Sequence, residues 1–199
     1  MKNIALALLA LFGLGLLVDP VAAQQAPSTD EIIQSLKPKV RTRGLAAPSI
    51  STEDSAFIQK LKVKTRGITI EERTQLSNIA TAAAMPSIDL EVTFALNSAK
   101  LEPRAVQTLQ RLGAALQSQE LGAATFLVGG HTDARGARDY NQKLSEERAR
   151  AVKVFLAENY RIQPERLIAV GYGQEQLKIL SDPYADENRR VKVINLGRN

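Results

Sequence analysis

The sequence predicts an α+β fold in which strands and helices follow one another as β-α-β-α-β-β and form two layers around a mixed four-stranded sheet. Residues 88–94 alternate between apolar and polar side chains, which indicates a strand with one buried face. Two longer segments, 102–116 and 140–160, carry apolar residues at helical spacing. Three short apolar runs supply the remaining strands, at residues 125–130, 167–170 and 191–194. We therefore expect the helices to cover one face of the sheet.

Residues that start or stop helices and strands mark the boundaries of these elements. The first helix begins at Pro103, because proline is tolerated in the first turn of a helix. The second strand ends at the glycine pair 129–130, and the second helix is followed by a turn at Pro164. Between the third and fourth strands, the polar stretch 182–188 is expected to form a loop with a short helical turn.

The composition is typical of a globular protein and excludes several kinds of site. The chain has 199 residues, of which 44% are hydrophobic and 24% are charged. It has no cysteine, which excludes disulfides, a thiol nucleophile, thiolate metal ligands and a lipid-modified cysteine. The single histidine, His131, lacks the partners of a zinc site, and a supporting or turn role is expected for it. We expect neither a metal nor a cofactor.

The first 23 residues have the pattern of a secretory signal peptide. Lys2 supplies the positive start, residues 4–18 are an apolar run, and residues 21–23 are small side chains suited to a cleavage site. The apolar run is shorter than the ~20 residues that cross a bilayer, although an uncleaved anchor is the alternative. We expect the mature protein to begin at Gln24 and to be exported.

Residues 24–86 are predicted to form a basic, partly ordered linker that contains a two-copy internal repeat. The repeat relates residues 33–45 to residues 58–68, and a Ser-Thr pair followed by acidic residues precedes each copy, which is a helix-start signal. Two copies are too few for a self-supporting stack. The segment is interpreted as a spacer, or alternatively as a docking element for an envelope protein or an anionic surface. A nucleic-acid partner is not expected for an exported protein.

One more helix is expected before the C-terminal domain. Within residues 71–84, Leu76, Ile79 and Ala80 are near helical spacing, and Pro86 ends the segment. We place the domain boundary there. The expected organisation is therefore a signal peptide at 1–23, a linker at 24–86 and a C-terminal domain at 87–199.

The loop after the second strand is the first candidate for a binding site. Loops at the C-terminal ends of strands commonly hold ligands in sheets with crossover helices. Asp133 offers an acceptor in this loop, and Gly130 and Gly136 permit tight turns and the close approach of a ligand.

The following helix adds a group of the opposite charge. Asn141, Leu144 and Arg148 are three and four residues apart, so they share one face of the helix. Arg148 lies at the edge of the apolar stripe, where a partly buried guanidinium needs an anionic partner. Asp133 can be that partner in a structural salt bridge. Alternatively, Asp133 and Arg148 together bind a zwitterion, with its ammonium at Asp133 and its carboxylate at Arg148.

Several spaced motifs in this region resemble the OmpA-like peptidoglycan-binding domain family. The string Gly-His-Thr-Asp-Ala-Arg-Gly at 130–136 and the blocks at 140–152 carry the main similarity. Phe94 with residues 97–101 precedes them, and the blocks at 171–173 and 188–191 follow. The similarity spans roughly residues 87–196, and it is specific because several blocks agree in order.

The resemblance implies binding of cell-wall peptidoglycan through the diaminopimelate group of its stem peptide, in a periplasmic protein associated with the outer membrane. It assigns the ammonium to Asp133 and the carboxylate to Arg148. The other ligand-binding positions of the family correspond to Thr132, Asn141, Leu144, Leu96, Asn97 and Arg190. The family often has an aromatic residue in place of Leu96 and aspartate in place of Asn97, so this chain lacks one charge there. The family places residues 189–190 near the site. A position at a solvated edge of the sheet, or a salt bridge to Asp133, is an equally good interpretation of this pair.

The motifs do not favour an enzyme. A glycosidase needs two carboxylates on either side of a cleft, and the motif loop supplies only Asp133. His131 and several serines are present, but the Gly-x-Ser-x-Gly motif of many hydrolases is absent. We therefore expect a non-enzymatic protein that ties the envelope to the wall. The alternative is an adaptor that binds a protein partner through residues 24–86.

Overall fold

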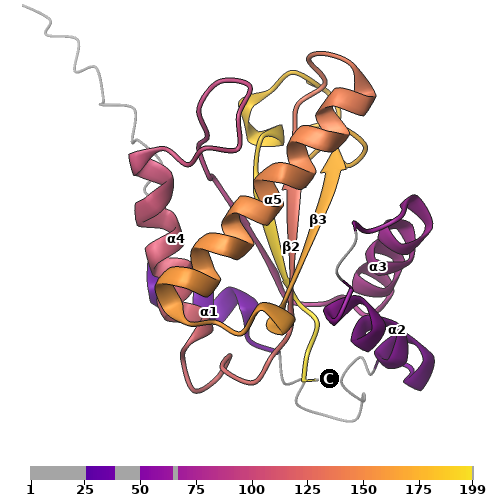
Figure 1. Cartoon of the computed structure of the whole chain (residues 1–199), viewed down its shortest axis with the longest axis vertical. Coiled ribbons are helices and arrows are strands. Elements are labelled where there is room, and N and C mark those ends of the chain that lie inside the picture. Colours follow the sequence, from indigo (N-terminus) through magenta and orange to yellow (C-terminus); the bar gives the residue numbers. More distant parts are fainter. Residues whose placement is uncertain (1–25, 39–49, 65–66, 199) are drawn as a thin grey trace, which may run out of the picture.

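A four-stranded sheet with the strand order β1-β4-β2-β3 forms the centre of the fold (Figure 1). The computed structural model describes residues 26–38, 50–64 and 67–198. The strands are β1 (Ser87–Leu90), β2 (Phe126–His131), β3 (Leu167–Gly173) and β4 (Val191–Asn195). β4 is antiparallel to both β1 and β2, whereas β2 is parallel to β3. The sheet is therefore mixed, as predicted.

Two helices that alternate with the strands cover one face of the sheet. They are α4 (Pro103–Leu116), which follows β1, and α5 (Arg138–Tyr160), which forms the crossover between β2 and β3. Phe126 and Val128 of β2 point to this face and belong to one hydrophobic core with Leu112 of α4. Both helices, and the first turn of α4 at Pro103, confirm the sequence prediction.

The opposite face of the sheet is covered as well, by α2 (Thr52–Lys62) and α3 (Ile70–Ala82) (Figure 1). Leu127 of β2 and Ile168 of β3 point to this face and form a second core with Leu76 of α3. The expectation that helices cover only one face is therefore corrected. β2 and β3 carry apolar side chains on both faces, as strands do when they are buried between two layers.

A further helix, α1 (Thr29–Leu36), packs in the same layer as α4 and contacts β1. Ile32 and Leu36 are fully buried in the first core. The side-chain amide of Asn195 donates a hydrogen bond to the Leu36 carbonyl at 2.8 Å, which ties the end of α1 to the end of β4. Arg111 of α4 hydrogen-bonds the Ala26 carbonyl and holds the chain just before α1.

The helices of the N-terminal segment are part of the packed structure. Ser28 and Ser51 cap α1 and α2, and the predicted helix before Pro86 is α3. The described helices of residues 24–86 contribute buried residues to both cores, and the role of this segment as a spacer or a docking element stays a prediction. Each short helix buries too few apolar residues for a core of its own, but the sheet supplies the rest.

Some of the predicted features lie outside the described residues, namely the signal peptide at 1–23 and the basic segments at 40–45 and 65–66. Across the described ranges, every helix is too short or too polar to cross a membrane. The two remaining elements are single 3-10 turns, η1 (Pro164–Arg166) and η2 (Asp186–Asn188). η2 confirms the short helical turn expected in the loop before the last strand.

Candidate functional site

The candidate site lies at the end of the sheet where β2 and β3 finish, at the top of Figure 1. The loop 132–137 leaves β2 there, and the long loop 174–190 leaves β3. The N–H of Thr132 donates to the Gly173 carbonyl at 2.9 Å, and the N–H of Ala134 donates to the Pro183 carbonyl at 3.0 Å. These bonds hold the two loops together and bring their charged side chains into contact.

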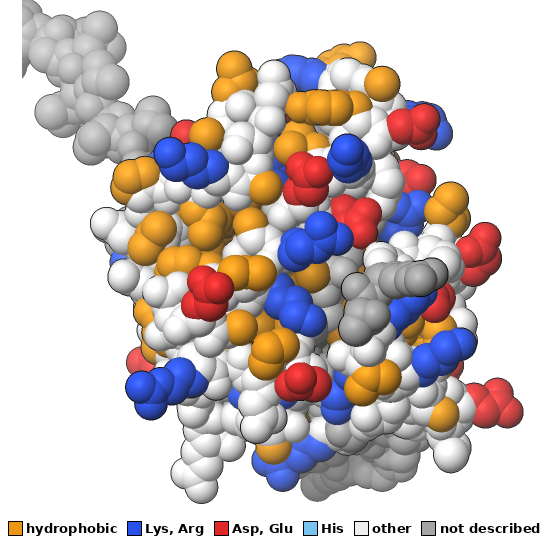
Figure 2. Space-filling model, in the orientation of Figure 1, with side chains coloured by type: hydrophobic (Ala, Val, Ile, Leu, Met, Phe, Trp, Pro, Cys, Tyr) orange, Lys and Arg blue, Asp and Glu red, His pale blue; other side chains and the backbone are white. Residues whose placement is uncertain are grey.

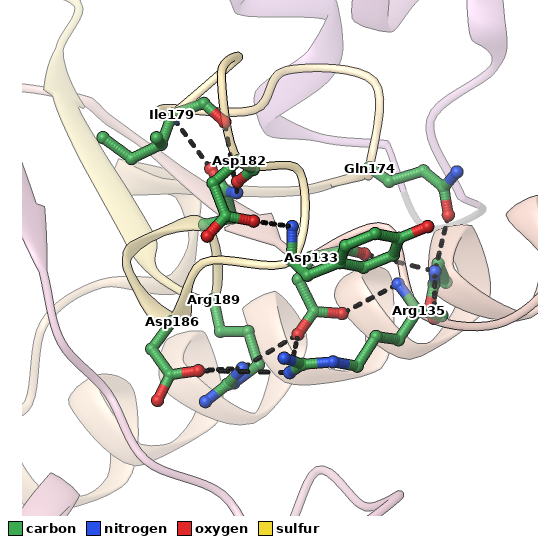
Figure 3. Close-up of polar contacts among 10 residues, drawn as sticks. Asp133, Arg135, Gln174, Ile179, Asp182, Asp186 and Arg189 are labelled. Carbon is green, nitrogen blue, oxygen red and sulfur yellow. Dashed lines mark hydrogen bonds and ion pairs between the residues drawn. The ribbon is translucent and has the colours of Figure 1, made fainter.

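Asp133 is the buried acid of the site, and both of its carboxylate oxygens accept hydrogen bonds (Figure 3). Its side chain is 7% exposed. Oδ1 accepts the backbone N–H of Arg135 at 3.0 Å. Oδ2 accepts Nη1 of Arg135 at 2.9 Å and Nη1 of Arg189 at 2.8 Å. The carboxylate is therefore held in one orientation by residues of both loops.

Arg189 connects Asp133 to a second acid, Asp186, at 2.7 Å. The hydrogen bond to Asp186 raises the pKa of Arg189, burial acts in the opposite direction, and the hydrogen bond to Asp133 raises it further. The pKa of Asp186 is lowered in turn, first by the hydrogen bond from Arg189 and then by its charge. The salt bridge between Arg189 and Asp133 is one of the alternatives that the sequence left open, and the structure shows it.

Arg148 projects from α5 and is the half-buried cation of the site. Its Nε donates to the Ser98 carbonyl at 3.0 Å, and its guanidinium carbon lies 4.9 Å from the centre of the Phe94 ring. Burial lowers the pKa of Arg148 below its ordinary value, Tyr140 acts in the opposite direction, and the smaller effects of Arg189 and Asp133 oppose each other. Among the described residues, no hydrogen bond engages its two Nη groups, so both can donate to a ligand.

Asp133 and Arg148 do not form the structural salt bridge that the spacing left open. Within the described residues, no hydrogen bond or ion pair joins them, and the carboxylate of Asp133 is bound by Arg135 and Arg189. The two predicted charges are therefore held separately, Asp133 by loop arginines and Arg148 by a backbone carbonyl.

A cavity of about 470 Å³ opens between Arg148, residues 89–94 and residues 186–191. Its charged lining residues are Asp89, Glu91, Glu102, Asp186 and Glu187 among the acids, and Arg148, Lys178, Arg189 and Arg190 among the bases. Asp133 does not line it and lies behind Arg189. Because both signs of charge face the cavity, it suits a ligand that carries both signs.

The surface of the protein carries charges of both signs. On the face drawn in Figure 2, basic and acidic side chains lie among one another, although the whole chain has a formal net charge of +5.

Asn141 supports the site from within α5. Its side-chain amide donates to the Arg135 carbonyl at 2.8 Å and to Gln174 Oε1 at 2.7 Å, which fixes the loop of Asp133 to the loop after β3. The structure thus places Asn141 next to the site, in a positioning role. Leu144 is buried on the same helix, 8% exposed, and does not line the cavity.

Gly130 allows α5 to lie directly on the sheet. A Cβ atom at this position would stand 2.2 Å from the backbone oxygen of Ser145, well inside contact distance. The Ser145 hydroxyl accepts the N–H of Gly173 at 2.8 Å, so the helix also holds the end of β3. This close approach sets the height of Arg148, one turn further along α5, above the sheet.

Like Asp133, Asn141 and Leu144, three further predicted ligand-binding residues do not line the cavity. Leu96 is 89% exposed, and Asn97 has a φ of 50° in a turn closed by the bridge between Phe94 and Leu101. Neither lines the cavity, although their neighbour Ser98 binds Arg148 through its carbonyl. Thr132 is buried, and its hydroxyl has no partner among the described residues.

Arg190 lines the cavity but is engaged by an acid on β1. Its Nε donates to Asp89 Oδ1 at 3.0 Å, and its side chain is only 9% exposed. A solvated edge, one of the two alternatives for this residue, is therefore excluded. Because its charge is neutralised within the protein, Arg190 is better placed to hold β4 against β1 than to bind a ligand.

His131 is a buried, uncharged residue beneath the site. It is 3% exposed and stacks on Tyr172 with ring centres 5.2 Å apart. Burial lowers the pKa of His131 to about 3, and the charges of Arg190 and Lys192 add to this effect. The described residues contain no cluster of acidic and histidine side chains that could hold a metal ion.

Residues 93–190 match the OmpA family, so this chain contains an OmpA family domain. The chain is 34% identical over 119 residues to outer membrane porin F of Pseudomonas aeruginosa, a region that covers 56% of this chain and 32% of the porin. It is 32% identical over 107 residues to the peptidoglycan-associated lipoprotein of Brucella melitensis, covering 52% and 62% of the two chains. The resemblance inferred from the motifs is confirmed.

Among solved structures, the chain is similar to the cell wall anchor of the T6SS from Pseudomonas aeruginosa. The two are 25% identical with a TM-score of 0.47, over 56% of this chain and 80% of that chain. This chain spans less than two thirds of either curated relative, 32% of the porin and 62% of the lipoprotein. Neither relative carries the name of an enzyme.

Proposed function

We propose that this protein binds cell-wall peptidoglycan without covalent attachment, through the diaminopimelate group of the stem peptide, and so ties the bacterial envelope to the wall. The OmpA family domain and the relative named peptidoglycan-associated lipoprotein support wall binding. The observation that carries the finer proposal is the half-buried side chain of Arg148, which lines a cavity of about 470 Å³ and whose Nη groups have no partner among the described residues.

In this proposal the two ends of an amino acid are recognised by opposite charges. The Nη groups of Arg148 donate two parallel hydrogen bonds to the ligand carboxylate, which is the strongest geometry available to such a pair. The Ser98 carbonyl and the Phe94 ring hold the guanidinium in place, so little side-chain entropy is lost on binding. Asp133 receives the ammonium, and Arg189 positions the Asp133 carboxylate.

The proposed location follows from the same relatives. Both are named for the outer membrane or for peptidoglycan, which supports a place in the envelope, in the periplasm and associated with the outer membrane. Cleavage of the signal peptide and a protein partner for residues 24–86 stay predictions.

Two muropeptides that differ by one carboxylate test the proposal. The first contains diaminopimelate and the second has lysine at the same position, which keeps the ammonium and lacks the carboxylate. We expect calorimetry to show at least about ten-fold tighter binding of the diaminopimelate form, because a charge-assisted hydrogen bond contributes about 1.5–3 kcal/mol. Equal binding of the two muropeptides would exclude the assigned role of Arg148.

A pair of arginine variants on α5 provides the control. Arg148→Gln is expected to remove the preference for diaminopimelate, because glutamine has no charged donors and cannot form two parallel charge-assisted hydrogen bonds with a carboxylate. Arg150→Gln makes the same charge change two residues away, at a side chain that is 60% exposed and pairs only with Glu146 within the described residues. It is expected to bind like the wild type.

A further inference from the structure

The carboxylate that the proposed function assigns to a ligand ammonium is covered in this structure. Arg135 and Arg189 both bind Asp133 (Figure 3). Asp133 is 7% exposed, whereas the side chains of Arg135 and Arg189 are 59% and 39% exposed. Both arginines donate to the same oxygen, Oδ2. An ammonium can therefore reach Asp133 only if one of these guanidinium groups moves.

The charges around Asp133 lead to the same requirement. Asp133 and Asp186 face Arg135 and Arg189, so these four residues together are neutral. An added ammonium would leave an excess positive charge next to a carboxylate that is already paired, and like charges at this distance repel. Departure of one guanidinium restores the balance.

Arg135 is the arginine that can leave. It pairs with Asp133 at 2.9 Å but stands 4.0 Å from Asp186, and more than half of its side chain is exposed. Nη1 of Arg189 is held by two acids, at 2.8 Å by Asp133 and at 2.7 Å by Asp186. A mostly exposed guanidinium with a single good contact is held less firmly than one with two, so moving Arg135 costs less than moving Arg189.

The backbone of Arg135 can remain in place when its side chain moves. Its N–H donates to Asp133 Oδ1 at 3.0 Å, independently of the guanidinium, and Asn141 holds its carbonyl at 2.8 Å. The Asp133 carboxylate thus keeps one donor on Oδ1 and Arg189 on Oδ2. The orientation needed for an incoming cation is already set.

We propose that Arg135 is a displaceable counter-ion: its guanidinium occupies Asp133 when no ligand is bound and gives way to the cationic group of a ligand. This inference rests on the proposed function, since it takes the ligand to carry an ammonium. Arg135 lowers the affinity for that ammonium, and it also reserves Asp133 for cations, because a neutral or anionic group cannot replace it.

The experiment compares Arg135→Gln with Arg138→Gln against two forms of one diaminopimelate muropeptide, one with its side-chain amine free and one with that amine acetylated. Arg138 is exposed at the start of α5 and provides the matched loss of one positive charge. Calorimetry should show R135Q binding the free-amine form about two- to five-fold more tightly than the wild type does, the range set by a weak surface ion pair. R138Q should bind both forms like the wild type.

The acetylated muropeptide separates competition from other effects. It has no ammonium, so R135Q should bind it no more tightly than the wild type does. Equal or weaker binding of the free-amine form by R135Q would overturn the inference, as would an equal gain for both forms. If the wild type binds neither form, the proposed function fails instead. Arg135→Met, with circular dichroism on both variants, guards against an effect of glutamine itself and should give the same gain.

Discussion

Nη1 of Arg189 lies 2.8 Å from Oδ2 of Asp133, which joins residues that are 56 positions apart in the sequence. The pair connects the loop after β2 to the residues just before β4. Asp133 is buried in the loop after β2, and Arg189 lines the cavity. A shift of this loop is therefore expected to move Arg189 and to change the shape of the cavity.

Replacement of Arg189 by glutamine is expected to lower the free energy of unfolding by about 1–2 kcal/mol, because the buried Asp133 loses a charged donor. Urea denaturation measures the change. Arg135→Gln is the matched comparison, since it removes a donor from the same oxygen. A smaller loss, below about 1 kcal/mol, is expected for it because its side chain is mostly exposed. Equal losses would show that Arg189 is no better anchored than Arg135.

Much of the fold follows from the periodicity of side chains along the chain. Residues 88–94 and the stripes of α4 and α5 have clear periods, and the predicted order of elements is correct. The packing of helices on the second face of the sheet was not predicted, although Leu127 and Ile168 lie within continuous apolar runs. Such runs indicate strands that are buried on both faces, and the missing layer had to come from the N-terminal segment.

The site was only partly predictable, for reasons that differ from residue to residue. Asp133 was predicted from its place in the loop after the second strand and Arg148 from helical spacing, and the family motif includes both. Arg135 is two residues after an aspartate in a turn, a spacing at which an aspartate side chain commonly accepts the backbone N–H, so a local signal existed. The contact of Arg148 with Ser98 uses a backbone carbonyl, which any residue provides, so the sequence carries no sign of it.

The stability of the protein is expected to fall between pH 7 and pH 5 through His131. Its pKa is about 3 in the folded state and about 6.5 when unfolded, so the unfolded chain takes up a proton that the folded chain refuses. The stabilisation from neutral His131 is complete above pH 6.5 and is lost progressively as the pH falls toward 3. Linkage gives a loss of about 2 kcal/mol from pH 7 to pH 5.

Denaturant titrations at pH 7 and pH 5 measure this loss. Because the chain has one histidine, no other imidazole side chain contributes to the difference. In His131→Phe, which retains an aromatic ring against Tyr172, the difference between the two pH values should shrink to a few tenths of a kcal/mol. A wild-type protein with the same stability at pH 5 and pH 7 would show that the buried ring accepts a proton without cost.

Gly130→Ala is expected to weaken both the fold and the site. The new methyl group would stand 2.2 Å from the backbone oxygen of Ser145, so α5 must move away from the sheet. We expect the free energy of unfolding to fall by about 3 kcal/mol, together with weaker muropeptide binding because Arg148 moves with the helix. In Gly67→Ala the nearest atom is the flexible end of Glu146, at 3.0 Å, so a much smaller loss is expected. If Gly130→Ala and Gly67→Ala lower the melting temperature by similar amounts, the close contact between Gly130 and Ser145 is contradicted.

The packing of α3 on the second face of the sheet can be tested with two alanine variants of the same helix. Leu76 is fully buried among residues of β2 and β3, whereas Ile70 is 67% exposed. Leu76→Ala is expected to cost about 2–5 kcal/mol, because it removes buried methylene groups and leaves a cavity against the sheet. Ile70→Ala is expected to cost less than about 0.5 kcal/mol, as exposed positions usually do. Equal, small losses in chemical denaturation would mean that α3 does not pack on the sheet, and would favour the spacer role for residues 24–86.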